Sequence, residues 1–189
     1  MIYLVSGFMR SGTSMMMKAL KEGGMEPAYR RYRDEYLNKR WGEPDEPNGY
    51  RPNEEYFELA RGDFEAHDFP NAYEGKVVKC LWNGSLRVNV CDARIIFMRR
   101  PQKEIVTSCM AAFGHAPRTA LADDFDLCMD RLVSIARDRR SFKSVSEIWY
   151  EEVLSDPLAV FRRLADEGWP VLPEKAAAIP KPSRKRYVA

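Results

Sequence analysis

The residues with the clearest chemistry lie at the start of the sequence, where Gly7 and Gly12 stand five positions apart. Arg10 lies between the two glycines, and the hydroxyl residues Thr13 and Ser14 follow the second one. Glycines allow positive φ angles and close approach to an anion, while the free N–H groups and the dipole of a following helix attract negative charge. The spacing therefore predicts a phosphate-binding loop. An ordinary strand, turn and helix with chance glycines is the alternative.

The loop differs from the nucleoside-triphosphate motif G-x-x-x-x-G-K-[ST] at Thr13, where that motif has its lysine. A γ-phosphate would lose its usual partner there, and Arg10 supplies the positive charge from within the loop instead. A kinase would also need an acidic residue at a strand end to hold Mg²⁺. Neither Met98-Arg99 nor Lys79, which close two apolar runs, supplies one. A small-molecule or nucleotide kinase would share the loop and is an alternative interpretation, but these two differences count against it.

A second basic group, Arg99-Arg100-Pro101, directly follows the strand expected at 94–98. Proline suits the first position of a helix, so the sequence again predicts a strand that leads cations to a helix N-terminus. The hydroxyls of Thr107 and Ser108 lie about two helical turns further on, which places one of them on a defined face of that helix. The sequence does not decide which one. A solvated Arg-Arg-Pro turn is the alternative.

Three motifs occur in the order and at the spacings of a known family. They are Arg-Ser-Gly-Thr at 10–13, Arg-x-Pro at 99–101, and Tyr-Glu followed by Asp-Pro within 150–157. Together they resemble the sulfotransferases, and the chain is similar to a short member of bacterial or phage type. The resemblance implies a three-layer α/β fold, with a parallel β-sheet flanked by helices as in P-loop NTPases. It also implies the donor 3′-phosphoadenosine 5′-phosphosulfate, the product adenosine 3′,5′-bisphosphate, and no metal.

The resemblance assigns roles to individual residues. Lys79 stands where the family has a lysine close to the sulfuryl group, and it would stabilise the leaving phosphate together with Arg10. Arg99, with a hydroxyl of the next helix, would bind the 3′-phosphate, and Arg184 in the basic tail would close over it. A lysine that reaches solvent and a frayed tail are the alternatives for Lys79 and Arg184. The residues implied for donor binding are Gly7, Met9, Arg10, Ser11, Gly12, Thr13, Ser14, Arg99, Thr107, Ser108 and Arg184.

These residues predict a sulfotransferase that moves a sulfuryl group to a hydroxyl or amine by in-line displacement. The acceptor is expected to be a small molecule, or a group on a glycan or peptide. A general base must take the acceptor proton, and Glu54 is preferred over Glu55, Asp63 and His67. Leu81 occupies the place of the catalytic histidine of cytosolic members. A non-catalytic nucleotide-binding module is therefore a further alternative.

The elements that must position these groups alternate between apolar runs and helical patterns. Strands are expected at 2–6, 76–82, 94–98 and 146–150, and helices from 13, from 101, over 123–139 and through 157–168. This alternation is typical of a parallel sheet covered by helices, with ligands at the carboxyl ends of the strands.

The segment 25–75 departs from this alternation, because aromatic side chains are interleaved with arginines in its first half. We expect it to form a lid or loop that faces the substrate. A surface helix from about Arg30 to Lys39 is the alternative. Asn53 and the acidic residues after it predict a capped helix over 53–59.

The composition limits the other functions. A chain of 189 residues with 45% apolar content suits a single domain over 1–189. Its net charge of +2 does not indicate a nucleic-acid partner, and no apolar run approaches the roughly 18 residues of a membrane span. Two histidines and four cysteines without C-x-x-C spacing predict no metal site and reduced thiols, and with no secretory signal expected, a cytoplasmic protein. The oligomeric state is not decided.

Overall fold

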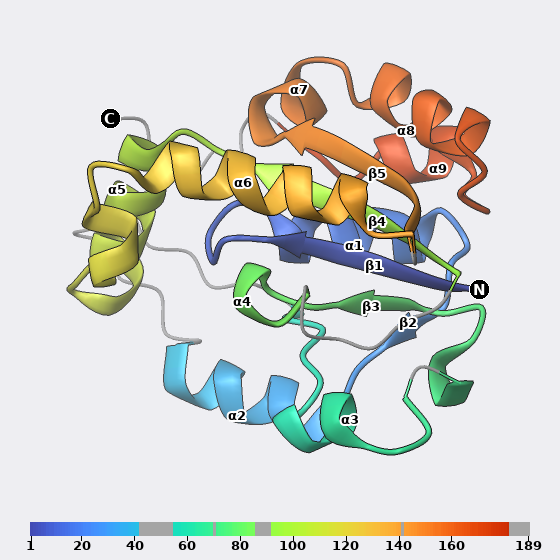
Figure 1. The fold of residues 1–189 in the computed structure, drawn as a ribbon, viewed down its shortest axis with the longest axis horizontal. Coiled ribbons are helices and arrows are strands. Elements are labelled where there is room, and N and C mark those ends of the chain that lie inside the picture. The colour runs from blue at the N-terminus through green and yellow to red at the C-terminus, as the bar shows by residue number, and fades with distance from the viewer. Residues whose placement is uncertain (42–54, 70, 86–91, 141, 182–189) are drawn as a thin grey trace.

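The computed structural model describes residues 1–41, 55–69, 71–85, 92–140 and 142–181 (Figure 1). Two predicted site residues, Glu54 and Arg184, lie outside these ranges. No helix within the ranges is both long and apolar enough to span a bilayer.

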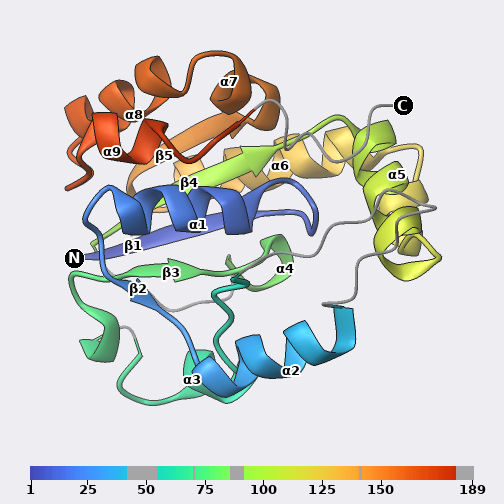
Figure 2. The same ribbon diagram turned by 180° about the vertical axis from the view of Figure 1, so that it is seen from behind.

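Five strands of the described residues form one parallel sheet in the order β2-β3-β1-β4-β5 (Figures 1 and 2). They are β1 (Ile2–Gly7), β2 (Pro27–Ala28), β3 (Val77–Lys79), β4 (Ala93–Arg99) and β5 (Phe142–Trp149). β1 is central, and its register sets Tyr3 opposite Val77 of β3 and Ile2 opposite Ala93 of β4. A parallel strand covered on both faces must be apolar along its whole length, which explains the continuous apolar run at the start of the sequence.

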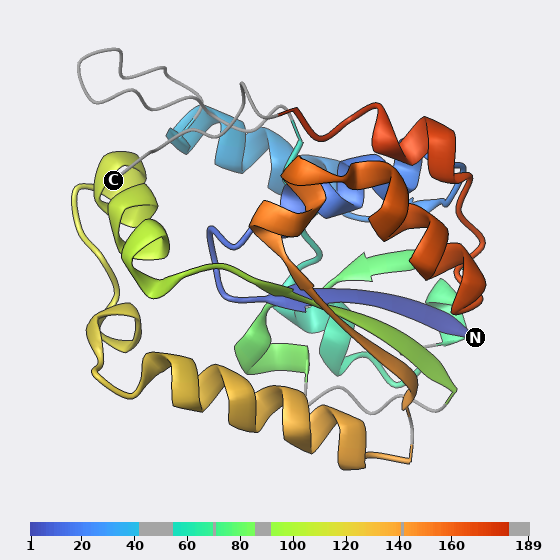
Figure 3. The ribbon, with the colours of Figure 1, turned by 90° about the horizontal axis from the view of Figure 1, so that it is seen from above.

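Helices cover both faces of the sheet, so the fold has three layers (Figure 3). On one face lie α1 (Thr13–Glu22), α7 (Tyr150–Ser155), α8 (Pro157–Asp166) and α9 (Pro173–Ala177), and on the other lies α6 (Phe125–Asp138). Leu20 and Phe161 close the core on the first face, whereas Phe97, Phe125 and Val133 close it on the second. The remaining elements are α2 (Arg31–Trp41), α3 (Arg61–Glu65), η1 (Asn71–Tyr73), α4 (Trp82–Ser85), α5 (Gln102–Phe113) and η2 (Arg118–Leu121).

The predicted α/β class with a parallel sheet between two helical layers is confirmed. The sequence predicted helix boundaries correctly where residues next to each other in the chain determine them. Asp156, for example, begins α8 by accepting the Ala159 N–H at 3.0 Å, and Pro157 is the first residue of the helix. Pro101 precedes α5 rather than opening it.

The segment 25–75 differs from the prediction in two places. Residues 31–41 form α2, which is the surface-helix alternative. The helix expected over 53–59 is wrong for its described part, because residues 55–59 have no regular structure. The physical reason is that the N–H groups of Tyr56, Phe57 and Glu58 donate to the Asp34 carboxylate instead of to helical carbonyls.

The parallel strands bring several chain segments to one edge of the sheet. β1 runs into the loop 8–12, β3 ends at Lys79, and β4 ends at Arg99. α5 stands beyond this edge (Figure 1). The groups that the sequence placed at strand ends therefore meet on one side of the molecule.

Candidate anion-binding site

The loop after β1 needs glycine at both ends. Gly7 has φ 141° and Gly12 has φ 99°, and Arg10 between them also has a positive φ, of 66°. A Cβ atom at Gly7 would lie 2.6 Å from the Met98 carbonyl oxygen, and one at Gly12 would lie 2.6 Å from the Tyr150 ring. The loop is thus pressed against β4 and α7, and α1 begins directly after Gly12, at Thr13.

Replacing Gly12 with alanine is expected to lower the free energy of unfolding by about 2 kcal/mol or more, because it adds a steric overlap to a left-handed backbone. Urea denaturation measures the change. Gly62→Ala is the matched control, because a Cβ there meets nothing within 4 Å and the residue lies in α3. Equal stabilities of the two variants would contradict the tight fit at Gly12.

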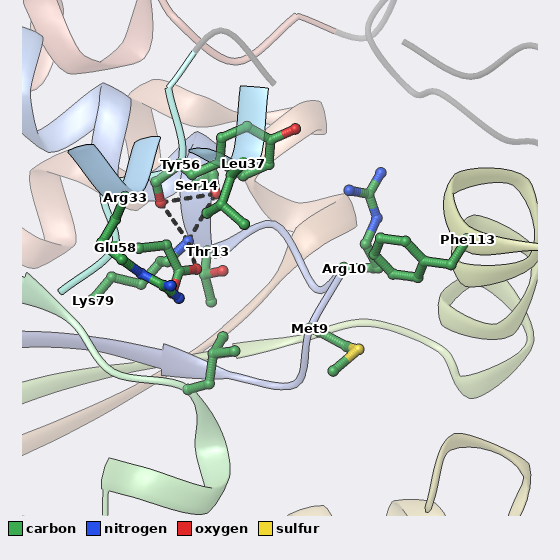
Figure 4. Close-up of a pocket in the computed structure, with 11 residues that line it drawn as sticks. Met9, Arg10, Thr13, Ser14, Arg33, Leu37, Tyr56, Glu58, Lys79 and Phe113 are labelled. Carbon is green, nitrogen blue, oxygen red and sulfur yellow. Dashed lines mark hydrogen bonds and ion pairs between the residues drawn. The ribbon is translucent and has the colours of Figure 1, made fainter. Parts of the chain in front are cut away.

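A cavity of about 210 Å³ opens beside this loop (Figure 4). The cavity has two ends in Figure 4, which we call the Lys79 end and the Arg10 end after the cation at each. At the Lys79 end, Lys79 and Glu58 lie below Tyr56, Ser14 and Arg33, whereas at the Arg10 end Arg10 lies beside Phe113. The lining residues are Met9, Arg10, Thr13, Ser14, Arg33, Leu37, Tyr56, Glu58, Lys79, Leu81 and Phe113.

Lys79 is the charged centre of this cavity and is only 5% exposed. Its ammonium group lies 2.8 Å from Glu58 Oε1, and it donates to Ser14 Oγ at 3.2 Å and to the Tyr56 carbonyl oxygen. A buried ammonium must be paired to remain charged, and these three acceptors provide the pairing. β3 therefore delivers a fixed cation to the first turn of α1.

A buried carboxylate, Asp34 of α2, holds the segment that contributes Glu58. Asp34 is 7% exposed, and it accepts the N–H groups of Tyr56, Phe57 and Glu58 at 3.1, 3.1 and 3.2 Å. Phe57 has a φ of 57°, an uncommon value for a bulky residue. The three hydrogen bonds to one carboxylate fix this turn and place the Tyr56 carbonyl and the Glu58 side chain over Lys79.

At the other end, Arg10 is tied to the helix that follows β4. Arg10 Nε donates to Ser108 Oγ at 3.0 Å, and Arg100 Nη1 donates to the Arg10 carbonyl oxygen at 3.0 Å. Arg100 also stacks 4.4 Å from the Tyr150 ring centroid and pairs with Glu104 at 2.9 Å. Its Nη2 is buried and has no hydrogen-bond partner in the described structure. A buried N–H without a partner is costly, so this atom fits an anion such as a phosphate.

The structure separates Arg99 from this arrangement. Arg99 is 4% exposed and pairs with Asp130 of α6 at 2.7 Å and with Glu147 of β5 at 3.1 Å. Successive strand residues face opposite sides, so Arg99 points to the α6 face whereas Arg100 contacts the loop. The sequence analysis missed Arg100, although Arg100 and Ser108 are eight residues apart, the same spacing that joins Arg99 to Thr107.

The two candidate hydroxyls on α5 have different surroundings. Ser108 is buried against Arg10, whereas Thr107 Oγ1 donates back to the Lys103 carbonyl oxygen at 2.9 Å within the helix. Met9 and Arg10 of the loop and Thr13 and Ser14 of α1 line the cavity. Ser11 of the loop is fully buried.

The described residues proposed as general bases are engaged elsewhere. Glu55 pairs with Lys21 at 2.6 Å, which raises the Lys21 pKa. Asp63 pairs with Arg30 at 2.5 Å and accepts the Ala60 N–H, and these contacts hold the pKa of Asp63 below its usual range. A lowered pKa makes a carboxylate a weaker base. His67 is exposed and does not line the cavity.

Glu58 is instead the acidic residue that lines the cavity, and the sequence analysis missed it. Cys80, which follows Lys79, is not an ionised nucleophile, because burial raises the pKa of its thiol to about 12. Within the ranges the structure describes, no group of three or more His, Cys, Asp or Glu side chains is placed to hold a metal ion.

No family model matches the chain. No curated protein matches it either. Among solved structures, the fold is similar to a chain in the crystal structure of retinol dehydratase in complex with androsterone and inactive cofactor PAP, with a TM-score of 0.47 and 13% sequence identity. The alignment covers 94% of this chain and 62% of that chain, so this chain spans less than two thirds of its length.

Proposed function

We propose that this protein is a sulfotransferase that moves a sulfuryl group from 3′-phosphoadenosine 5′-phosphosulfate to a hydroxyl or amine acceptor by in-line displacement. The observation that carries the proposal is the position of Lys79. A phosphate-type loop with Thr13 in place of the lysine receives its cation from the end of β3, where Lys79 contacts Ser14 Oγ. A fixed ammonium beside the N-terminus of α1 suits charge that develops on a leaving phosphate.

The residues around the loop fit such a donor. Thr13, Ser14 and the N–H groups at the start of α1 would hold the 5′-phosphate, with Arg10 and Lys79 as the cations. The buried Nη2 of Arg100 fits the 3′-phosphate, and Ser108 of α5, the helix that follows Arg100, would be the second ligand of this phosphate. The donor would supply the sulfuryl group, and adenosine 3′,5′-bisphosphate would be the leaving group. The chain's own residues bind it, orient it and neutralise the charge that is released.

Glu58 is the base that we propose for the acceptor proton. It lines the cavity, and Lys79 lies 2.8 Å from its carboxylate. Glu55 and Asp63 are also paired with cations, but neither lines the cavity, so Glu58 is the carboxylate placed to meet an acceptor hydroxyl there. Glu54 lies outside the described residues and stays a prediction.

Replacing Glu58 with glutamine is expected to lower kcat about 10²–10⁴-fold, the usual contribution of a positioned general base. The amide keeps the size of the side chain and removes its basicity. Transfer rates measured from low to high pH check the change, since the rate lost at neutral pH should recover as the acceptor ionises by itself. Glu55→Gln, which removes only the pair with Lys21, is the control, and a similar loss there would refute the role of Glu58.

The acceptor lies, in this proposal, against the segment 25–75. Arg33 and Leu37 of α2 and Tyr56 and Glu58 from the following segment line the cavity opposite the loop. A small molecule, or an exposed group on a glycan or peptide, suits this side. The assignment of residues 1–189 to one domain, the cytoplasmic location and the bacterial or phage type stay predictions.

A thermal melt tests the donor site. Adenosine 3′,5′-bisphosphate at about 100 times its Kd adds roughly 2.7 kcal/mol, which is a shift of roughly 5–11 °C for a chain of this size. We expect this shift without metal, and we expect Arg100→Gln to reduce it more than Arg99→Gln does. A shift with Mg²⁺-ATP alone would overturn the proposal in favour of a kinase.

The second candidate function is a non-catalytic nucleotide-binding module. It is favoured by Leu81, an aliphatic side chain that lines the cavity where the family resemblance places a histidine. Binding of the bisphosphate without transfer to any acceptor is the result expected for such a module.

A further inference from the structure

One cation of the cavity has no role in the proposed donor site. Arg33 projects from α2 into the Lys79 end of the cavity (Figure 4). Its Nε is buried without a hydrogen-bond partner, and the guanidinium forms no ion pair with any residue that the structure describes. Its Cζ lies 5.9 Å from the centroid of the Tyr36 ring. A buried donor without a partner indicates a ligand group that completes it.

The other cations near Arg33 already form ion pairs or hydrogen bonds with protein side chains. Lys79 pairs with Glu58, and Arg10 donates to Ser108. Beside Arg33, Arg30 pairs with Asp63 and Arg31 pairs with Glu35. Arg33 therefore differs from its two neighbouring arginines in facing the cavity with no carboxylate partner among the described residues.

The charge of the cavity supports an anionic ligand in addition to the donor. Three cations, Arg10, Arg33 and Lys79, and one carboxylate, Glu58, line it. The carboxylate lies 2.8 Å from Lys79, so its charge is compensated. The donor phosphosulfate is assigned to Arg10, Lys79 and the loop, and this leaves the charge of Arg33 for the acceptor.

The position of Arg33 is fixed by its neighbour in the helix. Asp34 anchors α2 to residues 56–58 by three hydrogen bonds, so the helix backbone that carries Arg33 is held beside the cavity before a ligand arrives. Leu37, one helical turn further on, and Tyr56 add apolar surface beside it. A ligand with an apolar body and an oxyanion at one end would match this apolar surface and the guanidinium beside it.

Building on the proposed sulfotransferase activity, we propose that Arg33 binds an oxyanion of the acceptor, and that the acceptor is a small hydroxylated acid rather than a neutral alcohol. The guanidinium fork suits a carboxylate or a phosphate ester, which it can bind through two parallel N–H groups. The hydroxyl of the same molecule then lies towards Glu58 and Lys79. Arg33 is on this basis a specificity-determining residue.

The test compares three phenols that share a hydroxyl and differ in charge. They are 4-hydroxyphenylacetate, 4-hydroxyphenyl phosphate and the neutral 4-hydroxyphenylacetamide. Each is titrated calorimetrically into the full chain, with and without saturating adenosine 3′,5′-bisphosphate, and each is assayed for transfer from the donor. We expect at least one anion to bind about tenfold or more tightly than the amide, as for other charge-assisted contacts, and to show a correspondingly lower KM.

Two variants assign the preference to Arg33. Arg33→Gln is expected to abolish the preference and to leave the affinity for the amide unchanged. Arg31→Gln, which removes an arginine that is 89% exposed from the same helix, is expected to keep it. The thermal shift with the bisphosphate should be the same in both variants, which shows that each is folded with an intact donor site.

The outcomes separate the two proposals. Equal binding of all three phenols, including no measurable binding of any at 10 mM, overturns the role of Arg33, as does a preference that survives Arg33→Gln. The absence of a thermal shift with the bisphosphate instead overturns the sulfotransferase function. The titrations without bisphosphate still decide the anion preference in that case.

Discussion

Replacing Lys79 with methionine is expected to lower kcat/KM for sulfuryl transfer about 10²–10³-fold, the usual effect of removing one preorganised group that stabilises developing charge. Methionine keeps the length of the aliphatic chain but removes the ammonium group that contacts Ser14 and Glu58. The loop amides and Arg10 stay in place, so binding of the bisphosphate should persist. The loss should therefore appear mainly in kcat.

Single-turnover assays and a melt with bisphosphate measure the two effects separately. Lys76→Met is the matched control, because Lys76 precedes the same strand and pairs with Glu26 at the surface. Its rate should stay within about twofold of wild type, as surface pairs contribute little. A Lys79→Met enzyme with the wild-type kcat would remove the main support for the proposed function.

Replacing Asp34 with alanine is expected to lower the free energy of unfolding by about 3 kcal/mol. Each hydrogen bond to a charged group contributes about 1.5–3 kcal/mol, and three N–H groups lose their acceptor together. The net loss is smaller than the sum of the three contributions, because water can accept hydrogen bonds from these N–H groups once the segment becomes mobile. Because Glu58 is held by this contact, transfer should fall as well.

Urea denaturation with a two-state fit measures the change. Asp34→Asn keeps one acceptor oxygen and should lose about half as much stability. Glu35→Ala, on the same helix, removes only an exposed pair with Arg31 and should change stability by less than about 0.5 kcal/mol. Equal losses for Asp34→Ala and Glu35→Ala would show that α2 is anchored by other contacts.

Sequence reasoning succeeded where a local rule decides the structure. The apolar run before Gly7 predicted a strand, because a strand buried on both faces requires such a run, and the structure places this strand at the centre of the sheet. The glycines at positions 7 and 12 predicted the loop because their backbone angles and close contacts exclude other residues. The Asp156-Pro157 start of α8 likewise depends only on neighbours in the chain.

Long-range contacts account for what the sequence did not predict. The segment after Asn53 has the pattern of a capped helix, but its N–H groups are taken by Asp34, about twenty residues earlier. The choice between Arg99 and Arg100 depends on which face of β4 meets α6, and the run Arg-Arg-Pro does not contain that information. Glu58 could have been found only by knowing that its segment crosses Lys79.

The place of β1 has a consequence for how the protein is made. β1 lies between β3 and β4 in the sheet, and both of these strands are synthesised after it. β1 therefore cannot pair with either neighbour until that neighbour has been made. At about 5–20 residues per second, β4 follows roughly 5–18 s later. During synthesis, this apolar strand is therefore without its sheet neighbours for seconds. During this interval the nascent chain exposes a short apolar segment of the kind that chaperones bind, whereas the folded protein buries every residue of that strand except Tyr3, which is half-buried.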